Sequence, residues 1–378
     1  MAVTNRRLAV YALGLLLLGV LVYHFREMFS QGNFSFQKLL FAVRRARFSL
    51  LLLSVAVIYL CYAIRALRWM RFSRHIKAMN FWNVYGLTLA GFASLFLLGR
   101  AGEPVRPLLI ARKEQVSVSS MFGIYFLERI FDTASTAVIA GFGLLSFSEL
   151  EIQEGSKELA RRVQTAGMVL LAGSLLTAAF LVYFRFHGAG ILDGRLSGWR
   201  GASGWRLKIA EIVSGISDGL RAIRTFADLA MAILYSAIHW TLVALIYLWV
   251  ARSFGGQFEL INFKGAMLVL AITMVGSTLQ VPGVGGGSQA ASFLAFTQFF
   301  GVEKEPAAAA AIVLWLVTFV ASSLGGVPLL IHEGLSLGKL RHLAEEAPLV
   351  AKESRSERDR WSENSESSER RDRGAPTE

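Results

Sequence analysis

The sequence predicts an all-α polytopic membrane protein with about six full spans and two broken or re-entrant hairpins. Of its 378 residues, 54% are hydrophobic and only 17% are charged, which is typical of membrane rather than soluble proteins. Several apolar runs approach the roughly 20 residues that a helix needs to cross a bilayer. Two further runs continue into polar segments rich in Gly and Pro, which predicts that the chain turns back there.

The apolar runs place these elements along the chain. We predict full spans at residues 8–25, 48–64, 118–147, 166–184, 229–251 and 307–332. The broken segments begin with residues 81–98 and 263–280. Arg6 and Arg7 precede the first run as in a signal peptide, but residues 24–27 offer no small-residue cleavage site. We therefore expect the first span to be retained as an anchor.

The basic residues predict an orientation. With both broken segments as hairpins, the N-terminus and the loops 65–80, 100–117 and 185–228 share one side and carry 18 Lys and Arg, against 11 on the other side. Positively charged loops favour the cytoplasm, so we predict a multi-pass plasma (inner) membrane protein with both termini cytoplasmic. The net charge of +12 is then explained by loop residues such as Arg65 and Arg68 beside anionic headgroups, and we expect no nucleic acid partner.

The same arrangement predicts an inverted repeat. The halves 8–147 and 166–332 each contain two spans, a broken segment and a further span, and they begin on opposite sides of the membrane. Broken segments at corresponding places in two inverted halves indicate a transport site near the bilayer midplane. We predict a transmembrane domain over residues 1–335, with an amphipathic interfacial helix at 199–228. Residues 336–378 are rich in Ser and charge, which predicts a disordered tail.

The first candidate site segment contains Arg100, Glu103 and Arg106. Pro104 and Pro107 are expected to stop regular helix, and irregular backbone at membrane depth is tolerated only inside protein or beside a watery cavity. Arg106 could offer a planar fork to a phosphate or carboxylate, with Glu103 fixing or neutralising it. The alternative is an ordinary cytoplasmic loop.

The second segment places Glu128, Arg129 and Asp132 in an apolar run. On a helix Glu128 and Asp132 share a face at i and i+4, and Arg129 can reach Asp132 at i+3. Glu128 would lie roughly 15 Å from a helix start near residue 118, at about mid-bilayer. A charged side chain at this depth costs free energy and usually has a function. One of the carboxylates could carry a coupled proton. The alternative is a cluster that only holds helices together.

The third segment is rich in glycine and precedes a half-helix at 290–300. Free N–H groups at the start of a helix can cradle an anion, although a glycine run can also be a hinge or a close helix crossing. No Walker A pattern supports ATP hydrolysis. The candidate residues are Pro282, Gly283, Gly285, Gly286, Gly287 and Gln289.

No residues indicate a resident metal or cofactor. Cys61 is the one cysteine, which excludes an intramolecular disulfide and a Cys-based metal site. The histidines lack metal-ligand spacing, and His239 is interpreted as a packing residue.

Together these segments resemble the lysylphosphatidylglycerol synthase transmembrane-region family of flippase-like membrane proteins. The resemblance covers about residues 10–335 and is carried by Arg100-x-Gly-Glu-x-x-Arg106, Glu128-Arg-x-x-Asp132 and Pro282-Gly-x-Gly-Gly286. It implies movement of a phospholipid or polyprenyl-phosphate-linked lipid between leaflets. Two departures stand out. Ser288 and Gln289 follow the glycines where the family often has Glu, and the soluble aminoacyl-transferase domain of the bifunctional synthases does not follow residue 334.

We therefore expect a lipid transporter without its own ATPase, in which Arg106, Arg129 and the glycine-rich helix start bind an anionic headgroup. Two alternatives remain open. One is a membrane enzyme that transfers a sugar or another group onto a lipid carrier, with Glu103, Glu128 or Asp132 as base or metal ligand. The other is a non-catalytic partner of an envelope-lipid synthase. Partners beyond lipid and membrane would be a second copy of the chain or such an enzyme.

Overall fold

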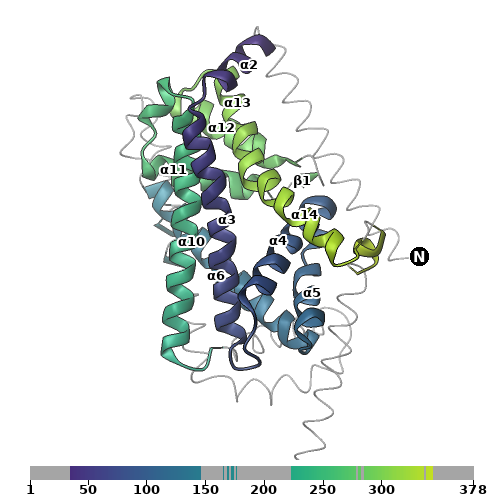
Figure 1. The fold of residues 1–378 in the computed structure, drawn as a ribbon. Helices are drawn as coiled ribbons and strands as arrows, with labels where there is room; N and C mark the ends of the chain where they lie inside the picture. Colours follow the sequence, from purple (N-terminus) through teal and green to yellow (C-terminus); the bar gives the residue numbers. More distant parts are fainter. Residues whose placement is uncertain are drawn as a thin grey trace, which may run out of the picture.

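The computed structural model describes residues 35–145, 223–277, 280–281, 285–335 and 338–343, together with positions 165, 168, 169, 172, 173 and 176. The described part is almost entirely helical (Figure 1). Its elements are α2 (Phe36–Arg45), α3 (Phe48–Ser73), α4 (Phe81–Leu98), η1 (Gly99–Gly102), α5 (Val105–Glu114), α6 (Val118–Leu145), α10 (Phe226–Ser253), η5 (Gly256–Leu260), α11 (Phe263–Gly276), β1 (Gln280–Val281), β2 (Gly285–Gly286), α12 (Gly287–Phe300), α13 (Lys304–Trp315), η6 (Leu316–Ala321) and α14 (Ser322–His332).

Two long antiparallel helices, α3 and α10, form the centre of the structure (Figure 1). Helix α10 starts with a capping box, in which the Thr225 side chain accepts from the backbone of Asp228 and the Asp228 side chain accepts from the backbone of Thr225. This arrangement satisfies two N–H groups that would otherwise lack partners at the helix start. Helix α3 does not stop at residue 64, where the apolar run ends, but continues to Ser73. Arg65 and Arg68 are therefore buried helix residues, and their assignment to a loop was wrong.

Helices α4 and α5 form a hairpin that folds back on itself. Ser94 donates through its hydroxyl to the carbonyl of Gly102 at 2.9 Å, and Gly91 lies against the side chain of Arg106. The tip is the short helix η1, and α5 begins at Val105 with Pro104 as its N-cap. Pro107 lies in the first turn of α5, where proline is tolerated because the N–H there needs no helical partner. The expectation that Pro107 ends regular helix was therefore wrong, and Arg106 is a helix residue.

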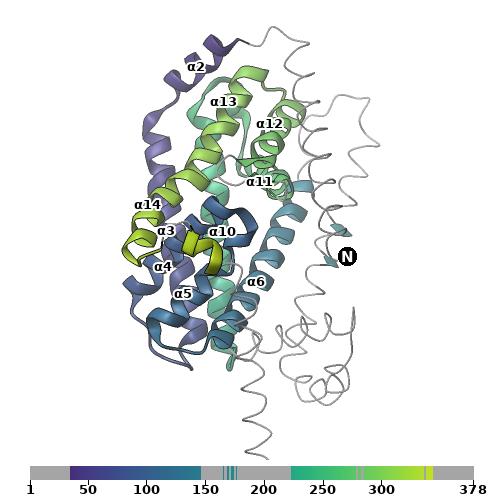
Figure 2. The same ribbon diagram turned by 90° about the vertical axis from the view of Figure 1, so that its right-hand side faces the viewer.

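Helices α11 and α12 form a second broken segment. The chain between them carries a two-stranded pair, in which β1 and β2 run antiparallel with Gln280 opposite Gly286. Figures 1 and 2 agree that α4–α5 lies in the half of the molecule away from α2, whereas α11–α12 lies in the half that contains α2.

The last long element is α13, which continues through a π-helical stretch, η6, into α14. The hydroxyl of Tyr59 on α3 donates to the carbonyl of Ala321 in η6 at 2.5 Å, which ties the widened turn to the central pair. Helix α14 then packs on α4. Past it, Leu343 is buried with Leu108 of α5 and Phe122 of α6, and Leu340 is also buried. The rest of the predicted tail, residues 344–378, lies outside the described residues.

Four described helical segments are long and apolar enough to cross a membrane. They are Phe48–Ser73, Phe81–Gly102, Phe226–Ser253 and Lys304–His332. Three of them contain the predicted spans 48–64, 229–251 and 307–332. The segment Phe81–Gly102 is long enough to cross, although the chain then returns in α5. The predicted spans 8–25 and 166–184 and the helix at 199–228 lie wholly or mostly outside the described residues.

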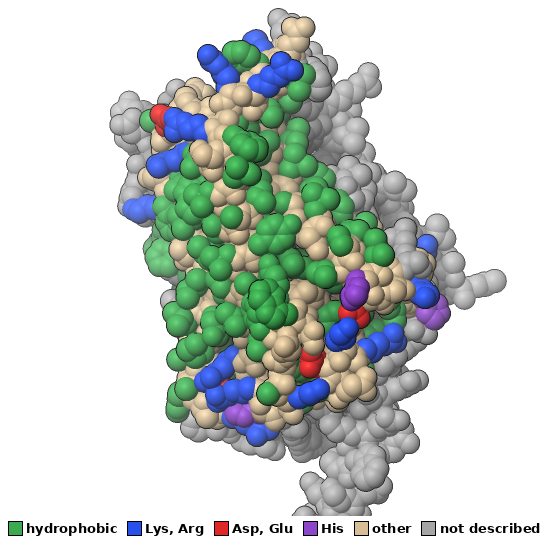
Figure 3. Space-filling model, in the orientation of Figure 1, with side chains coloured by type: hydrophobic (Ala, Val, Ile, Leu, Met, Phe, Trp, Pro, Cys, Tyr) green, Lys and Arg blue, Asp and Glu red, His purple; other side chains and the backbone are tan. Residues whose placement is uncertain are grey.

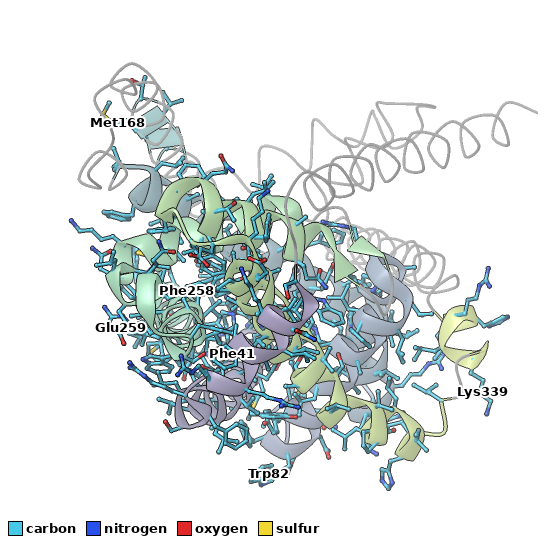
Figure 4. The ribbon with its side chains drawn as sticks, turned by 90° about the horizontal axis from the view of Figure 1, so that it is seen from above. Phe41, Trp82, Met168, Phe258, Glu259 and Lys339 are labelled. Atoms are coloured by element: carbon cyan, nitrogen blue, oxygen red, sulfur yellow. The ribbon has the colours of Figure 1, made fainter. Side chains whose placement is uncertain are left out.

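The distribution of hydrophobic and basic side chains on the surface is typical of a membrane protein. Hydrophobic side chains cover the middle of the face in Figure 3, and Lys and Arg side chains gather toward its upper and lower ends. Seen from above in Figure 4, Trp82 points outward at the edge, whereas Phe258 points in among the helices. Their exposed fractions agree, at 72% for Trp82 and 1% for Phe258. The all-α membrane fold is thus confirmed in its coarse form.

Candidate functional site: a buried arginine cluster

Six charged side chains from three helices meet inside the half of the molecule that holds the α4–α5 hairpin. We call this group the arginine cluster. Helix α3 supplies two arginines, α5 supplies one, and α6 supplies the remaining three residues. Its members are Arg65, Arg68, Arg106, Glu128, Arg129 and Asp132.

Glu128 is the centre of the cluster and is 0% exposed. Its Oε1 accepts from Arg65 at 2.8 Å and from Arg68 at 3.0 Å. Its Oε2 accepts from Arg106 and, at 2.7 Å, from the indole N–H of Trp69. Both carboxylate oxygens are therefore fully engaged with donors of the protein. Glu128 holds the arginines in place and has no free oxygen for a ligand.

Asp132 lies one helical turn further along α6 and joins the same arginines. Its Oδ1 accepts from Arg68 at 2.7 Å, and its Oδ2 forms an ion pair with Arg65 at 3.0 Å. Arg129 donates to the same Oδ2 at 3.0 Å, as its i+3 spacing predicted. The side chain of Arg129 is 36% exposed, far more than those of the other arginines in the cluster, so the cluster reaches the surface there.

Helical spacing explains why these residues meet. On α3, Arg65, Arg68 and Trp69 follow the i, i+3, i+4 pattern that places side chains on one face. Aromatic rings then shield the guanidinium groups: Arg106 lies 4.6 Å from the ring centre of Trp69, and Arg65 lies 5.0 Å from that of Phe92. Such cation–π contacts stabilise a cation that has lost its water.

Helix α10 completes the site with polar groups. Arg68 donates to the hydroxyl of Ser236 at 2.8 Å. Arg65 lies 3.4 Å from Nε2 of His239, whose Nδ1 is 3.3 Å from the carbonyl of Cys61. His239 is thus a partnered interior residue of the α3–α10 interface.

A second ionic group continues this interface toward the end of α3. Asp228 at the start of α10 is buried and pairs with Arg71 at 3.1 Å, Arg74 at 2.7 Å and His75 at 3.3 Å. We call the whole series of contacts, from His239 and Ser236 to Asp228, the α3–α10 polar seam. The seam links the arginine cluster to the charged end of the molecule.

Arg100 and Glu103 lie beside the cluster at the hairpin tip. Arg100 is 65% exposed at its side chain and lies 3.9 Å from Glu103. Glu103 accepts from the hydroxyl of Tyr125, and the ring of Tyr125 lies 5.3 Å from the guanidinium of Arg129. The predicted pairing of Glu103 with Arg106 was wrong, because Arg106 is held by Glu128 instead.

The glycine segment is arranged differently from the prediction. Pro282 and Gly283 lie outside the described residues. The backbone N–H of Gly286 donates to Oε1 of Gln289 at 2.5 Å, so this N–H is not free for an anion, contrary to expectation. Gly285 and Gly287 are buried.

Trp315 of α13 lies between the two broken segments. Gly285 lies beside the indole of Trp315, and Trp315 packs against Phe96 near the tip of the first hairpin, with ring centres 6.0 Å apart. The described glycines therefore approach the other hairpin, but by way of side chains that carry no charge.

Four members of the site were not predicted from the sequence: Arg65, Arg68, Trp69 and Ser236. The first three could have been found, because their helical spacing continues that of buried Cys61 and Tyr62 on the same helix. Ser236 carries no signal, since a lone serine in an apolar span is common in helix packing.

The chemistry of the cluster favours binding over catalysis. Arginine stays protonated in proteins and cannot act as a base, and both carboxylates are saturated by arginine. In the part of the chain that the structure describes, no three His, Cys, Asp or Glu side chains are grouped so that they could hold a metal ion. Guanidinium groups are well suited to hold phosphate or carboxylate.

The long apolar helices and the buried ionic cluster define a multi-pass membrane protein. A family model described as lysylphosphatidylglycerol synthase TM region matches residues 8–326, and the chain belongs to this family. The resemblance predicted from the three sequence segments is thereby confirmed. A comparison with curated proteins gave no match.

Proposed function

We propose that this protein is a lipid transporter that moves an anionic phospholipid or a polyprenyl-phosphate-linked lipid between leaflets. Membership of a lipid-linked membrane family supports lipid handling. The observation that carries the proposal is the arginine cluster. Four guanidinium groups gather around two carboxylates inside an apolar protein. Burying charged side chains costs free energy. Binding of a charged headgroup would explain why the protein contains this cluster.

In this proposal, Arg106 and Arg129 contact the headgroup, and Glu128 and Asp132 hold the arginines in position. Arg100 and Glu103 lie at the entrance beside Tyr125. Gly285, Gly286, Gly287 and Gln289 form the facing wall from the second broken segment. The lipid tail stays in the bilayer, as the apolar middle of the surface would permit (Figure 3).

We infer that the two halves form an inverted repeat, with hairpins that enter from opposite faces. The reciprocal packing supports this inference: α14 packs on the first hairpin through α4, and α6 packs on the second through α11, while α3 and α10 pack on each other. Gly326 of α14 approaches the backbone of Leu89, and Gly143 of α6 approaches that of Leu268. Each half thus places a glycine of its last helix against the broken segment of the other half.

We place the protein in the plasma membrane, with the α4–α5 end cytoplasmic. Arg65, Arg68 and Arg106 are buried and no longer count as loop charges. The remaining loop residues still number 15 on the predicted cytoplasmic side against 11 on the other, so the charge rule keeps its direction. A second copy of the chain or an envelope-lipid enzyme remains a proposed partner.

The test is a leaflet-exchange assay in proteoliposomes that contain a fluorescent anionic phospholipid. We expect Arg106→Ala and Glu128→Gln to slow exchange at least tenfold. The matched control is Arg112→Gln, because Arg112 lies on the same helix as Arg106 but is exposed, and it should exchange lipid at the wild-type rate. Variants are compared only when they elute as single species of wild-type size. Wild-type rates in both site variants would contradict the proposal.

A further inference from the structure

The arginine cluster has an excess of positive charge. Four guanidinium groups, those of Arg65, Arg68, Arg106 and Arg129, face the two carboxylates of Glu128 and Asp132. The excess is two charges. Among the described residues, including the rim does not change this excess, because Arg100 and Glu103 pair with each other and cancel.

The protein cannot remove this excess by titration. Arginine keeps its proton in protein interiors, and the ring of His239 beside Arg65 can only add positive charge. Three of the four guanidinium groups are buried, with side chains between 1% and 8% exposed. An uncompensated charge at such a place is unfavourable by several kcal/mol, so we expect a bound group to supply the missing negative charge.

Two arginine N–H donors of the cluster also lack hydrogen-bond partners among the described residues. The Nε of Arg68, whose side chain is only 1% exposed, has no hydrogen-bond partner in the described part of the chain, and neither has the Nε of Arg129. Buried donors without partners are rare in native structures and need an explanation. An oxygen-rich anion would satisfy donors and charge together, and Arg129 gives it access because its side chain is 36% exposed.

We propose that the cluster selects a lipid headgroup with two negative charges, a terminal phosphomonoester or a diphosphate, over a phosphodiester with one. A phosphomonoester carries about −1.5 to −2 charges at neutral pH, which matches the excess of two. A phosphodiester headgroup leaves one charge uncompensated. This inference rests on the proposed lipid function, because it takes the anion to be part of a lipid.

Binding of defined lipids to the purified full chain tests the inference. Native mass spectrometry at pH 8 compares dioleoyl phosphatidic acid, dioleoyl phosphatidylglycerol and dioleoyl phosphatidylcholine, which share their acyl chains. We expect phosphatidic acid to bind at least tenfold more tightly than phosphatidylglycerol. Equal affinities for these two lipids would overturn the inference. Displacement of phosphatidic acid by millimolar inorganic phosphate would overturn the lipid assignment in favour of a soluble phosphate.

Variants of the arginine cluster test whether it causes the preference for phosphatidic acid. Arg129→Gln lowers the excess to one charge and should reduce the preference for phosphatidic acid to threefold or less, whereas Arg129→Lys should retain it. Arg112→Gln is the matched control and should leave it unchanged. An unaltered preference in Arg129→Gln would overturn the assignment to this cluster. Selective binding without leaflet exchange would support the inference and contradict the transporter proposal, so the two can fail separately.

Discussion

At the scale of single residues, Glu128 determines the geometry of the site. Its two oxygens accept from three arginines and one indole N–H, and no water-exposed surface remains on it. A carboxylate in this position is better suited to fix the arginines than to shuttle a proton, because protonation would remove the negative charge that balances them. Of the three carboxylates that the sequence offered as carriers of a coupled proton, Glu103, Glu128 and Asp132, Glu128 is therefore the least suited.

The first prediction concerns this residue. Glu128→Gln removes the central negative charge and leaves three guanidinium groups facing each other, so it should destabilise the protein by about 3–5 kcal/mol. Thermal unfolding in detergent measures the loss. Glu103→Gln is the control, because Glu103 lies at the partly exposed rim and should change stability by less than about 1 kcal/mol.

The double variant Glu128→Gln/Arg106→Gln tests whether these two residues stabilise the protein through their contact with each other. It removes one charge of each sign, so its destabilisation should be smaller than the sum of the two single losses. Additive losses would mean that Arg106 and Glu128 act independently, against the contact between them.

At the scale of elements, close helix packing positions the hairpins. Helix α14 passes so near to α4 that a side chain at Gly326 would meet the backbone carbonyl of Leu89. Gly86 lies in the same interface, but there a methyl group would meet only the flexible end of Leu329 at 3.6 Å. The interface therefore contains one position that requires glycine and one that does not.

The second prediction uses this pair. Gly326→Ala should destabilise the protein by about 1–3 kcal/mol, because backbone has to move to make room. Gly86→Ala should be neutral or stabilising by up to about 1 kcal/mol, because alanine favours helix. Thermal unfolding of both variants is compared in the same detergent. A larger loss in Gly86→Ala than in Gly326→Ala would contradict the packing described here.

Individual helices show which parts of the fold could be predicted from the sequence and which could not. Apolar runs located α4 and α6 to within two residues at each end, because hydrophobic length is a strong local signal. The end of α3 was misplaced, since Arg65 and Arg68 interrupt the apolar run although both pair with carboxylates of α6. Which acid pairs with Arg106 depends on three helices meeting in space, and no spacing along the chain encodes that.

At the scale of the whole molecule, the proposed inverted repeat predicts that the ends of the two hairpins face opposite sides of the membrane. Positive charge at the α4–α5 end agrees with a cytoplasmic location. Exposed residues near each end can report on this arrangement: Arg112 lies near the end of α5, and Arg44 lies near the end of α2 at the other end of the molecule.

The third prediction follows from that arrangement. Arg44→Cys should react with a membrane-impermeant thiol reagent in intact cells, and Arg112→Cys should react only after the cells are opened. The native Cys61 is buried and should stay unlabelled, which makes the wild-type chain the background control. Labelling of both positions from the same side would rule out hairpins on opposite faces.

The α3–α10 polar seam has a consequence for motion. Along it, Arg65 meets His239, Arg68 meets Ser236, and Arg71 and Arg74 meet Asp228. A slide of one helix past the other by a single turn, about 5.4 Å, would part all these pairs at once. We therefore expect α3 and α10 to keep a fixed register in any rearrangement that opens the molecule to one side and then the other.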